Sequence, residues 1–308
     1  MLKRTLLILA CSASLISQKT IDVNRANSIP IIDGIVIDDP AWIDVKTISD
    51  FTQKTPDEGF EISEKTIVRI MYSDQHFYVS VIAYDKNPNR IVVSDTRRDA
   101  PLNNSDSFSF IIDTFKDFQT GYLFGTNAAG IEFDAQITGG GEGGSISRRF
   151  SIGSGGGFNV NWDAVWEVKT AKGDFGWSAD VAIPFKSLRY KEDQDQSWGI
   201  NFERVIAKKK EESHWAPIPS QFTMTRLVSA GTINNVNVPI SRNIKIIAYV
   251  LGQTNKVEKN KINPSKKIAD DIPDNLPRPP DSMFIIVCPI IAHPPIALKN
   301  PQTKLAIP

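Results

Sequence analysis

Two runs of alternating apolar and polar residues, joined by a short polar link, constrain this chain more than any other feature. Phe108, Phe110 and Ile112 would lie on one face of an extended strand and the serines beside them on the other, because successive side chains of a strand point to opposite faces. Tyr122 and Phe124 repeat the pattern after the link. The sequence therefore predicts a β-hairpin at the centre of a sheet.

Short segments of this kind recur along most of the chain and are separated by turn-forming residues. No helical period of roughly 10 to 15 residues lies between them, which favours an antiparallel fold over an α/β fold. We predict an all-β protein, folded over residues 28–240 as an antiparallel, jelly-roll-like β-sandwich. Within 31–42 an apolar strand is expected beside an Asp33-Gly34 turn, followed by a Pro-led short turn that places Trp42. The further strands expected are 66–71, 76–84, 130–137, 161–168, 176–184, 198–206 and 212–217, and 130–137 would be half exposed to solvent.

The charge and cysteine content exclude several classes of protein. Lys plus Arg and Asp plus Glu number 35 each, so no net field would draw the chain to nucleic acid or to anionic lipid. Lys208, Lys209 and Lys210 are followed at once by two glutamates, which is typical of a solvated hairpin tip rather than of a phosphate-binding patch. Cys11 and Cys288 are too few for a disulfide framework or for a four-ligand zinc site in the body of the chain.

The two ends of the chain differ in composition from its middle. Residues 1–17 begin with Lys3 and Arg4 and continue with apolar and small residues, which predicts a signal peptide and export. The tripeptide at 9–11 alternatively resembles a lipoprotein signal. Ten of the 19 prolines lie beyond residue 263, so residues 256–308 are predicted to form a disordered tail. No stretch after the signal approaches the roughly 18 apolar residues of a membrane-spanning helix.

Four motifs, in a consistent order, resemble those of a known family. They lie at 32–42 (IDGIVIDDPAW), 105–115 (SDSFSFIIDTF), 162–167 (WDAVWE) and 176–189 (GWSADVAIPFKSLR). The chain resembles the family 9 carbohydrate-binding modules, and in particular the variant that precedes the β-barrel of bacterial outer-membrane proteins of unknown function.

The resemblance implies a β-sandwich that binds a polysaccharide or oligosaccharide through exposed aromatic side chains, often holds structural calcium and has no catalytic residues. It also implies a location in the periplasm or outer membrane of a Gram-negative bacterium. Residues 241–255 would be a remnant of the first strand of a barrel that is otherwise missing.

Sugar recognition requires a flat aromatic face against the apolar side of the ring and planar polar groups for its hydroxyls. Trp162 follows a glycine-rich stretch and Trp215 lies at a strand end beside prolines, so these two are the predicted platforms, with partial burial as the alternative. Arg98 and Asp99 lie in a loop before the central hairpin and could contact hydroxyls or form an internal salt bridge. The tryptophans predicted to be core residues are Trp42, Trp166 and Trp198.

Carboxylates of the central hairpin could hold a metal ion. Asp106 and Asp113 bracket its first strand and are candidates for structural Ca²⁺. Seven residues of extended strand would separate them by about 23 Å, at roughly 3.3 Å per residue, so they could not share one ion. The alternative is that these carboxylates cap turns.

Three functions remain open from the sequence. The first is an exported, noncatalytic carbohydrate-binding module linked to carbohydrate catabolism. The second is an interaction or plug module of an outer-membrane barrel protein, with a protein partner. The third is a fragment of a glycoside hydrolase, which needs two carboxylates about 5 to 10 Å apart. No spacing in the sequence brings together any two of the candidates Asp134, Asp163, Glu167 and Asp180.

Overall fold

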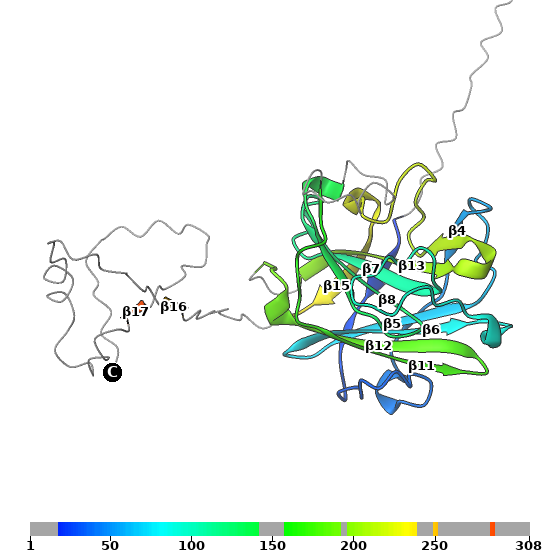
Figure 1. Cartoon of the computed structure of the whole chain (residues 1–308), viewed down its shortest axis with the longest axis horizontal. Helices are drawn as coiled ribbons and strands as arrows, with labels where there is room; N and C mark the ends of the chain where they lie inside the picture. Colours follow the sequence, from blue (N-terminus) through cyan, green and yellow to red (C-terminus); the bar gives the residue numbers. More distant parts are fainter. Residues whose placement is uncertain (1–17, 142–156, 192–195, 239–248, 252–283, 287–308) are drawn as a thin grey trace, which may run out of the picture. The chain divides into compact units, whose positions relative to one another are not determined.

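The computed structural model of the chain describes residues 18–141, 157–191, 196–238, 249–251 and 284–286 (Figure 1). The chain divides into two compact units, Met1–Ile240 and Ser241–Pro308. In the second unit, β16 (Tyr249–Leu251) pairs antiparallel with β17 (Phe284–Ile286). The predicted signal peptide at 1–17 and most of the predicted barrel remnant and tail lie outside the described residues.

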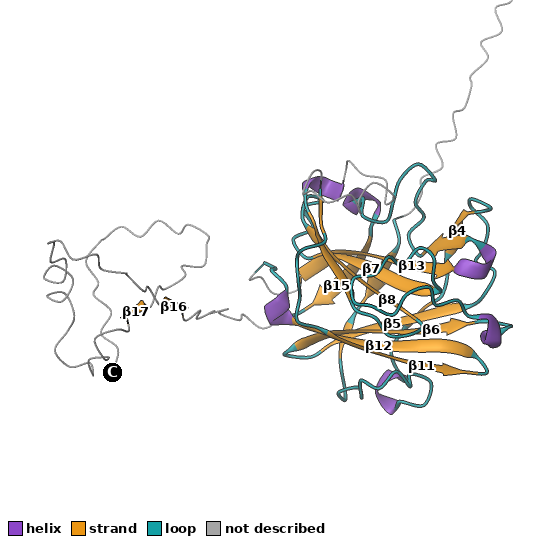
Figure 2. Ribbon diagram, in the orientation of Figure 1, coloured by secondary structure: helices purple, strands orange, loops and turns teal. Residues whose placement is uncertain are grey.

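The first unit is a sandwich of two facing β-sheets (Figure 2). The larger sheet has the order β1-β15-β13-β7-β8-β9-β10, and β14 and β4 extend it beside β13. Its strands are β1 (Thr20–Asp22), β4 (Thr52–Thr55), β7 (Ser107–Asp113), β8 (Gly121–Asn127), β9 (Phe133–Ile137), β10 (Phe158–Asn159), β13 (Gln196–Ile206), β14 (Glu211–His214) and β15 (Gly231–Val236).

The smaller sheet has the order β11-β12-β6-β5-β2, with β3 also paired to β5. Its strands are β2 (Asn24–Arg25), β3 (Thr47–Ile48), β5 (Thr66–Tyr72), β6 (His76–Tyr84), β11 (Glu167–Gly173) and β12 (Gly176–Pro184). Two pairs, β1 with β15 and β2 with β5, are parallel, so the sheets are mixed rather than purely antiparallel. Both parallel pairs involve the N-terminal segment, which contributes one short strand to each sheet and begins before residue 28.

The helices within the described residues are all 3-10 turns of three residues. They are η1 (Pro40–Trp42), η2 (Pro88–Arg90), η3 (Gly139–Gly141), η4 (Phe185–Ser187), η5 (Ala207–Lys209) and η6 (Leu227–Ser229). None of these turns is long enough to span a membrane. The all-β sandwich predicted from the alternating segments is confirmed.

The core between the sheets contains the inward face of the central hairpin. Phe108, Phe110 and Ile112 of β7 are buried there, and so are the aromatic side chains of β8. The Phe110 ring lies 5.6 Å from the Phe124 ring and 6.3 Å from the Phe202 ring of β13, measured between centroids. The three tryptophans predicted to be core residues are all buried. Alternation in the sequence therefore identified the inward face of the hairpin correctly.

A second apolar cluster covers the outer face of the larger sheet. Phe133, Ala135 and Ile137 of β9 belong to it, together with residues such as Met224 and Leu227 from the segment between β14 and β15. The prediction that 130–137 is half exposed is therefore wrong for β9 itself, in which only Gln136 is partly exposed. The alternation of β9 is real, but its polar face turns toward the main core, where Asp134 lies directly opposite Phe124 and is buried. The chain at 218–230 covers the apolar face on the outside of the sheet.

The apolar strand predicted beside the Asp33-Gly34 turn does not form. Gly34 has a φ of 88°, which interrupts an extended conformation. Ile31 and Ile35 are exposed, and Ile35 retains 51% of its accessible surface. The segment instead lies as a loop against the outer face of the smaller sheet, where Val36 and Trp42 pack in a third apolar cluster with residues of β5, β6 and β12.

Asp180 of β12 anchors this loop from beneath. Its buried carboxylate accepts hydrogen bonds from the Gly34 amide at 3.2 Å and from Trp42 Nε1 at 3.1 Å. Burial raises the pKa of Asp180 to about 7 despite these two donors. A carboxyl group in an unfolded chain has a pKa of about 3.9, so between about pH 4 and pH 7 the folded protein holds one proton that the unfolded chain releases.

This proton should make stability depend on pH. We expect the free energy of unfolding to fall as the pH rises from about 4 to 7, by up to about 1.4 kcal/mol per pH unit, and then to level off. D180N should flatten that slope when urea unfolding is measured across the range. D38N, which changes an exposed carboxylate of the same loop, is the matched control and should keep the wild-type slope. An unchanged slope in D180N would contradict the assignment.

Candidate functional site

An exposed group of charged side chains lies around Arg98, in the loop before β7. The Arg98 guanidinium approaches Glu132 at 2.7 Å, Asp134 at 2.9 Å and Asp99 at 3.5 Å, and it also pairs with Asp163. We call these five residues the Arg98 cluster. It contains one cation and four carboxylates, and the Arg98 side chain retains 43% of its accessible surface.

Asp134 of β9 is the buried anchor of the Arg98 cluster. Its Oδ2 accepts the Ala164 amide at 2.7 Å, and its Oδ1 accepts Trp166 Nε1 at 3.3 Å as well as Arg98. Burial raises the pKa of Asp134. Burial would lower the pKa of Arg98, but the surrounding carboxylates outweigh that effect and raise it. The guanidinium is therefore charged and held in one place by its partners.

The remaining carboxylates of the Arg98 cluster face solvent. Asp163 retains 78% of its side-chain surface, and Asp99 and Glu132 are also accessible. The Asp99 amide donates to the Glu132 carbonyl at 2.9 Å, which ties the loop to the start of β9. Carboxylate oxygens accept hydrogen bonds and guanidinium groups donate them, so this surface offers both kinds of partner to a hydroxyl-rich ligand.

Trp162 lies next to the Arg98 cluster in the sequence and is half-buried. Its ring packs on Tyr122 at 4.9 Å and on Phe124 at 6.0 Å between centroids. The tryptophan thus packs at the margin of the core and keeps part of its surface accessible. This position corresponds to the partial-burial alternative, and the platform role of Trp162 stays a prediction.

Trp215 does not have the exposure that a platform needs. It retains 3% of its accessible surface and packs in the main core, with its ring 5.8 Å from that of Phe202. A β carbon on Gly231 would lie 2.5 Å from the Trp215 ring, so the backbone of β15 fits closely over the indole. Trp215 is therefore a core side chain.

The two predicted calcium carboxylates are buried, and each accepts hydrogen bonds from the backbone. Asp113 accepts the amide of Phe118 at 2.9 Å and that of Asp117 at 3.4 Å, which closes the turn between β7 and β8. Asp106 accepts the Val92 amide at 2.8 Å and lies 3.6 Å from the Arg204 guanidinium. Calcium takes six to eight oxygen ligands, and a neighbouring cation opposes its binding. The turn-capping alternative describes Asp113.

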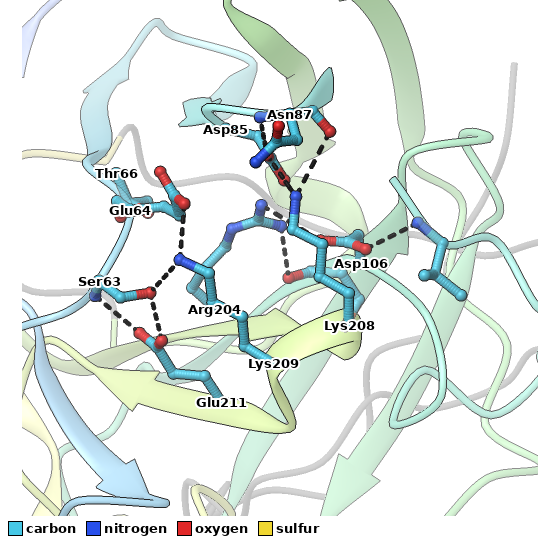
Figure 3. Close-up of polar contacts among 12 residues, drawn as sticks. Ser63, Glu64, Thr66, Asp85, Asn87, Asp106, Arg204, Lys208, Lys209 and Glu211 are labelled. Carbon is cyan, nitrogen blue, oxygen red and sulfur yellow. Dashed lines mark hydrogen bonds and ion pairs between the residues drawn. The ribbon is translucent and has the colours of Figure 1, made fainter. Parts of the chain in front are cut away.

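Arg204 belongs to a buried charged cluster between the sheets (Figure 3). Its guanidinium lies 5.1 Å from the Trp177 ring and near several carboxylates. Burial lowers the pKa of Arg204 to about 10, while carboxylates led by Asp106 and Asp85 oppose that effect, so the group stays charged at neutral pH. The acidic residues of this cluster are Glu64, Asp85, Asp106 and Glu211.

The lysine run at 208–210 takes part in this cluster. Lys208 Nζ lies 2.6 Å from Asp85 Oδ2, and Lys209 Nζ lies 2.6 Å from Glu64 Oε1 (Figure 3). The run does form the tip of the hairpin between β13 and β14, as predicted. Two of its three ammonium groups nevertheless pair with buried acids instead of projecting freely into water.

No family model and no curated protein matches the sequence. Among solved structures, a candidate carbohydrate-binding protein from Bacteroides uniformis is similar at 14% identity and a TM-score of 0.51, over 71% of this chain and 99% of that one. The similarity shows a shared fold.

Two further solved structures are of a family 9 carbohydrate-binding module from Caldicellulosiruptor kristjanssonii. The complex with glucose has 16% identity and a TM-score of 0.49, and the complex with cellotriose has 18% identity and a TM-score of 0.47. Each similarity covers 73% of this chain and all of the module.

The structure adds site residues that sequence reasoning missed. Glu132, Asp134 and Asp163 come together around Arg98, although they lie 34 to 65 positions from it in the sequence. Asp134 and Asp163 were weighed only as hydrolase carboxylates, while Glu167 and Asp180 lie in the smaller sheet and outside the Arg98 cluster. No local pattern marks this convergence, since it depends on how β9 and the 161–166 segment meet the loop.

Proposed function

We propose that this protein is an exported, noncatalytic carbohydrate-binding module that contacts its sugar through the Arg98 cluster and the accessible part of Trp162. The observation that carries the proposal is a guanidinium held by four carboxylates, three of them open to solvent, with the half-buried Trp162 directly before Asp163 in the sequence. Such a surface provides donors and acceptors for hydroxyls next to an apolar face. The shared fold with a candidate carbohydrate-binding protein supports the same class.

Binding without catalysis is supported by the state of Asp134. Both of its oxygens already accept hydrogen bonds, and its side chain is buried. A glycosidase acid must reach the glycosidic oxygen, and its partner must reach the sugar carbon or a water molecule. Asp163 is accessible, but Arg98 lies between the two carboxylates and pairs with both. Incubation of the chain with oligosaccharides should therefore release no reducing sugar.

Binding should depend strongly on Arg98. We expect the folded chain to bind at least one glycan on an array that includes glucose and cellotriose, and R98Q to weaken that binding by roughly tenfold to a hundredfold, because hydrogen bonds to charged groups contribute about 1.5–3 kcal/mol. R97Q is the matched control, since Arg97 is exposed and pairs with Asp95 outside the cluster. Isothermal calorimetry with the best glycan measures both.

A second variant separates recognition from folding. D163N removes an exposed carboxylate and leaves no buried charge unpaired, so it should weaken binding while urea unfolding stays unchanged within about 0.5 kcal/mol. Absence of binding to every glycan by a folded chain would reject the proposal. Equal glycan affinities of R98Q, D163N and the wild type would show that the sugar binds outside the Arg98 cluster.

Export and a link to carbohydrate catabolism complete the proposal. Residues 1–17 carry the expected signal, and the location expected is the periplasm or outer membrane of a Gram-negative bacterium. An interaction module of a barrel protein remains the second candidate from the sequence resemblance. Glycan binding that is abolished in R98Q would favour the sugar over a protein partner.

A further inference from the structure

The hairpin of β13 and β14 presents three potential metal ligands on its outer face. Glu203 of β13 lies directly opposite His214 of β14. Two positions further along β13, Val205 lies opposite Glu212 of β14. Directly paired and diagonal side chains on one face of an antiparallel pair lie within contact distance. Arg204, which lies between Glu203 and Val205 on β13, points inward to Trp177. Glu203, Glu212 and His214 therefore converge on the side of the sheet away from the main core.

The spacing of their ligand atoms suits a small tetrahedral ion. His214 Nε2 lies 3.2 Å from Glu212 Oε1 and 3.5 Å from Glu203 Oε2, and one atom from each residue falls within 4.8 Å of the others. Zinc binds histidine nitrogen and carboxylate oxygen at about 2.0–2.2 Å, so ligands at tetrahedral angles lie about 3.3–3.6 Å apart. The two measured separations fall at or close to that range.

His214 is held in place without a hydrogen bond. The residue is buried, and neither of its ring nitrogens makes a hydrogen bond to the described part of the chain. A buried polar atom that lacks a partner costs free energy, which an ion bound at Nε2 would recover. The Nε2 atom lies within 3.5 Å of both carboxylates.

A route to the site exists from the surface. Glu203 and Glu212 line a cavity of about 460 Å³ on this face, together with residues such as Val205, Lys210 and Thr225. An ion could enter through the cavity, and a further ligand could approach the ion from it. Three protein ligands with an accessible remaining position is the arrangement found in zinc sites that bind a water molecule or a substrate.

The geometry points to a binding site for one divalent transition-metal ion, of the Zn²⁺ type, formed by Glu203, Glu212 and His214. Imidazole with carboxylate favours zinc, nickel or cobalt over calcium, which prefers six or more oxygen ligands. Calcium is thus a poor candidate for this position. The site is separate from the Arg98 cluster and does not depend on the sugar-binding proposal.

Lys54 of β4 is the competitor for this site. Its Nζ lies 2.7 Å from Glu212 Oε1, and the side chain is buried. The ammonium group supplies positive charge to the same carboxylate that an ion would use. Removing that charge in K54M should therefore tighten metal binding, which is the opposite of what a purely structural lysine would produce.

The test is a titration of the full chain with Co²⁺, followed by its visible d–d absorption, and then displacement by Zn²⁺. We expect the wild-type chain to bind one equivalent of tetrahedral Co²⁺ and H214Q to bind none. E203Q should bind Co²⁺ at least roughly tenfold more weakly, since mutation even of the outer-shell partners of metal ligands lowers metal affinity about 10–100-fold. H76Q is the matched control, because His76 starts β6 in the other sheet. Metal held by cysteines or by His293 would be common to all variants.

E203Q is the variant less expected to disturb folding, because Glu203 is partly exposed whereas His214 is buried. A loss of binding in E203Q therefore does not depend on the folding of H214Q. Near-UV circular dichroism of the six tryptophans verifies that each variant is folded. A K54M variant that binds cobalt more tightly than the wild type supports the site. Equal uptake by wild type, H214Q and E203Q, or no uptake by the folded wild-type chain, overturns it.

Discussion

Replacing Arg204 by methionine should lower the free energy of unfolding by about 3–5 kcal/mol, the cost of removing one partner from a buried charged group. Arg204 is fully buried, and its nearest carboxylate, Asp106, is equally buried at 3.6 Å. Methionine fills much of the same volume but supplies no charge. Asp106 would be left facing Lys208 and the other acids of the cluster without its guanidinium.

Urea unfolding measures this effect, and two further variants interpret it. R97M makes the same change at an exposed arginine and should stay within about 0.5 kcal/mol of the wild type. The double variant R204M/D106N should recover part of the loss, since it removes the uncompensated carboxylate together with its partner. A loss in R204M no larger than in R97M would show that the buried cluster contributes little to stability.

Replacing Trp42 by alanine should destabilise the protein by a similar amount, about 3–5 kcal/mol, as is typical for large aromatic side chains in a core. Trp42 retains 1% of its accessible surface and packs against Met71, Tyr78 and Ile82 on the outer face of the smaller sheet. The substitution leaves a cavity, and it also removes the indole donor from Asp180.

Two substitutions separate these contributions. W42F keeps an aromatic ring but loses Nε1 and part of the indole volume, so it should cost less than W42A, about 1–3 kcal/mol. I35A, in the same loop but exposed, should stay within about 0.5 kcal/mol of the wild type. Thermal or urea unfolding compares the three. Equal losses of unfolding free energy in W42A and I35A would mean that packing of Trp42 does not stabilise the loop on the sheet.

The apolar faces of β7 and β9 were both predictable from the sequence, but the segments that cover them were not. Phe108 and Phe133 both lie in strands with clean alternation, and the pattern placed both among apolar neighbours. Phe108 faces the main core, whereas Phe133 faces the outer cluster beneath the chain at 218–230. Alternation shows that a strand has two unlike faces, but the covering segment is chosen by contacts distant in the sequence.

The same limit applies to the candidate sites. Trp162 and Trp215 both stood beside turn-forming residues, yet one is half-buried at the margin and the other is enclosed between β13 and β15. Arg98 was identified because charged residues in a loop suggest a role, while its partner Asp134 reads only as the polar face of a strand. Burial cannot be read from a strand whose two faces are both covered.

The sequence alone determined the all-β class, the central hairpin and the core positions of Trp42, Trp166 and Trp198, because side-chain alternation and turn residues act over a few neighbouring positions. Only the tertiary structure decided that 31–37 is a loop, that four carboxylates surround Arg98, and that His214 meets two glutamates. These features depend on strand register and on contacts between distant segments, for which a single sequence carries no local signal.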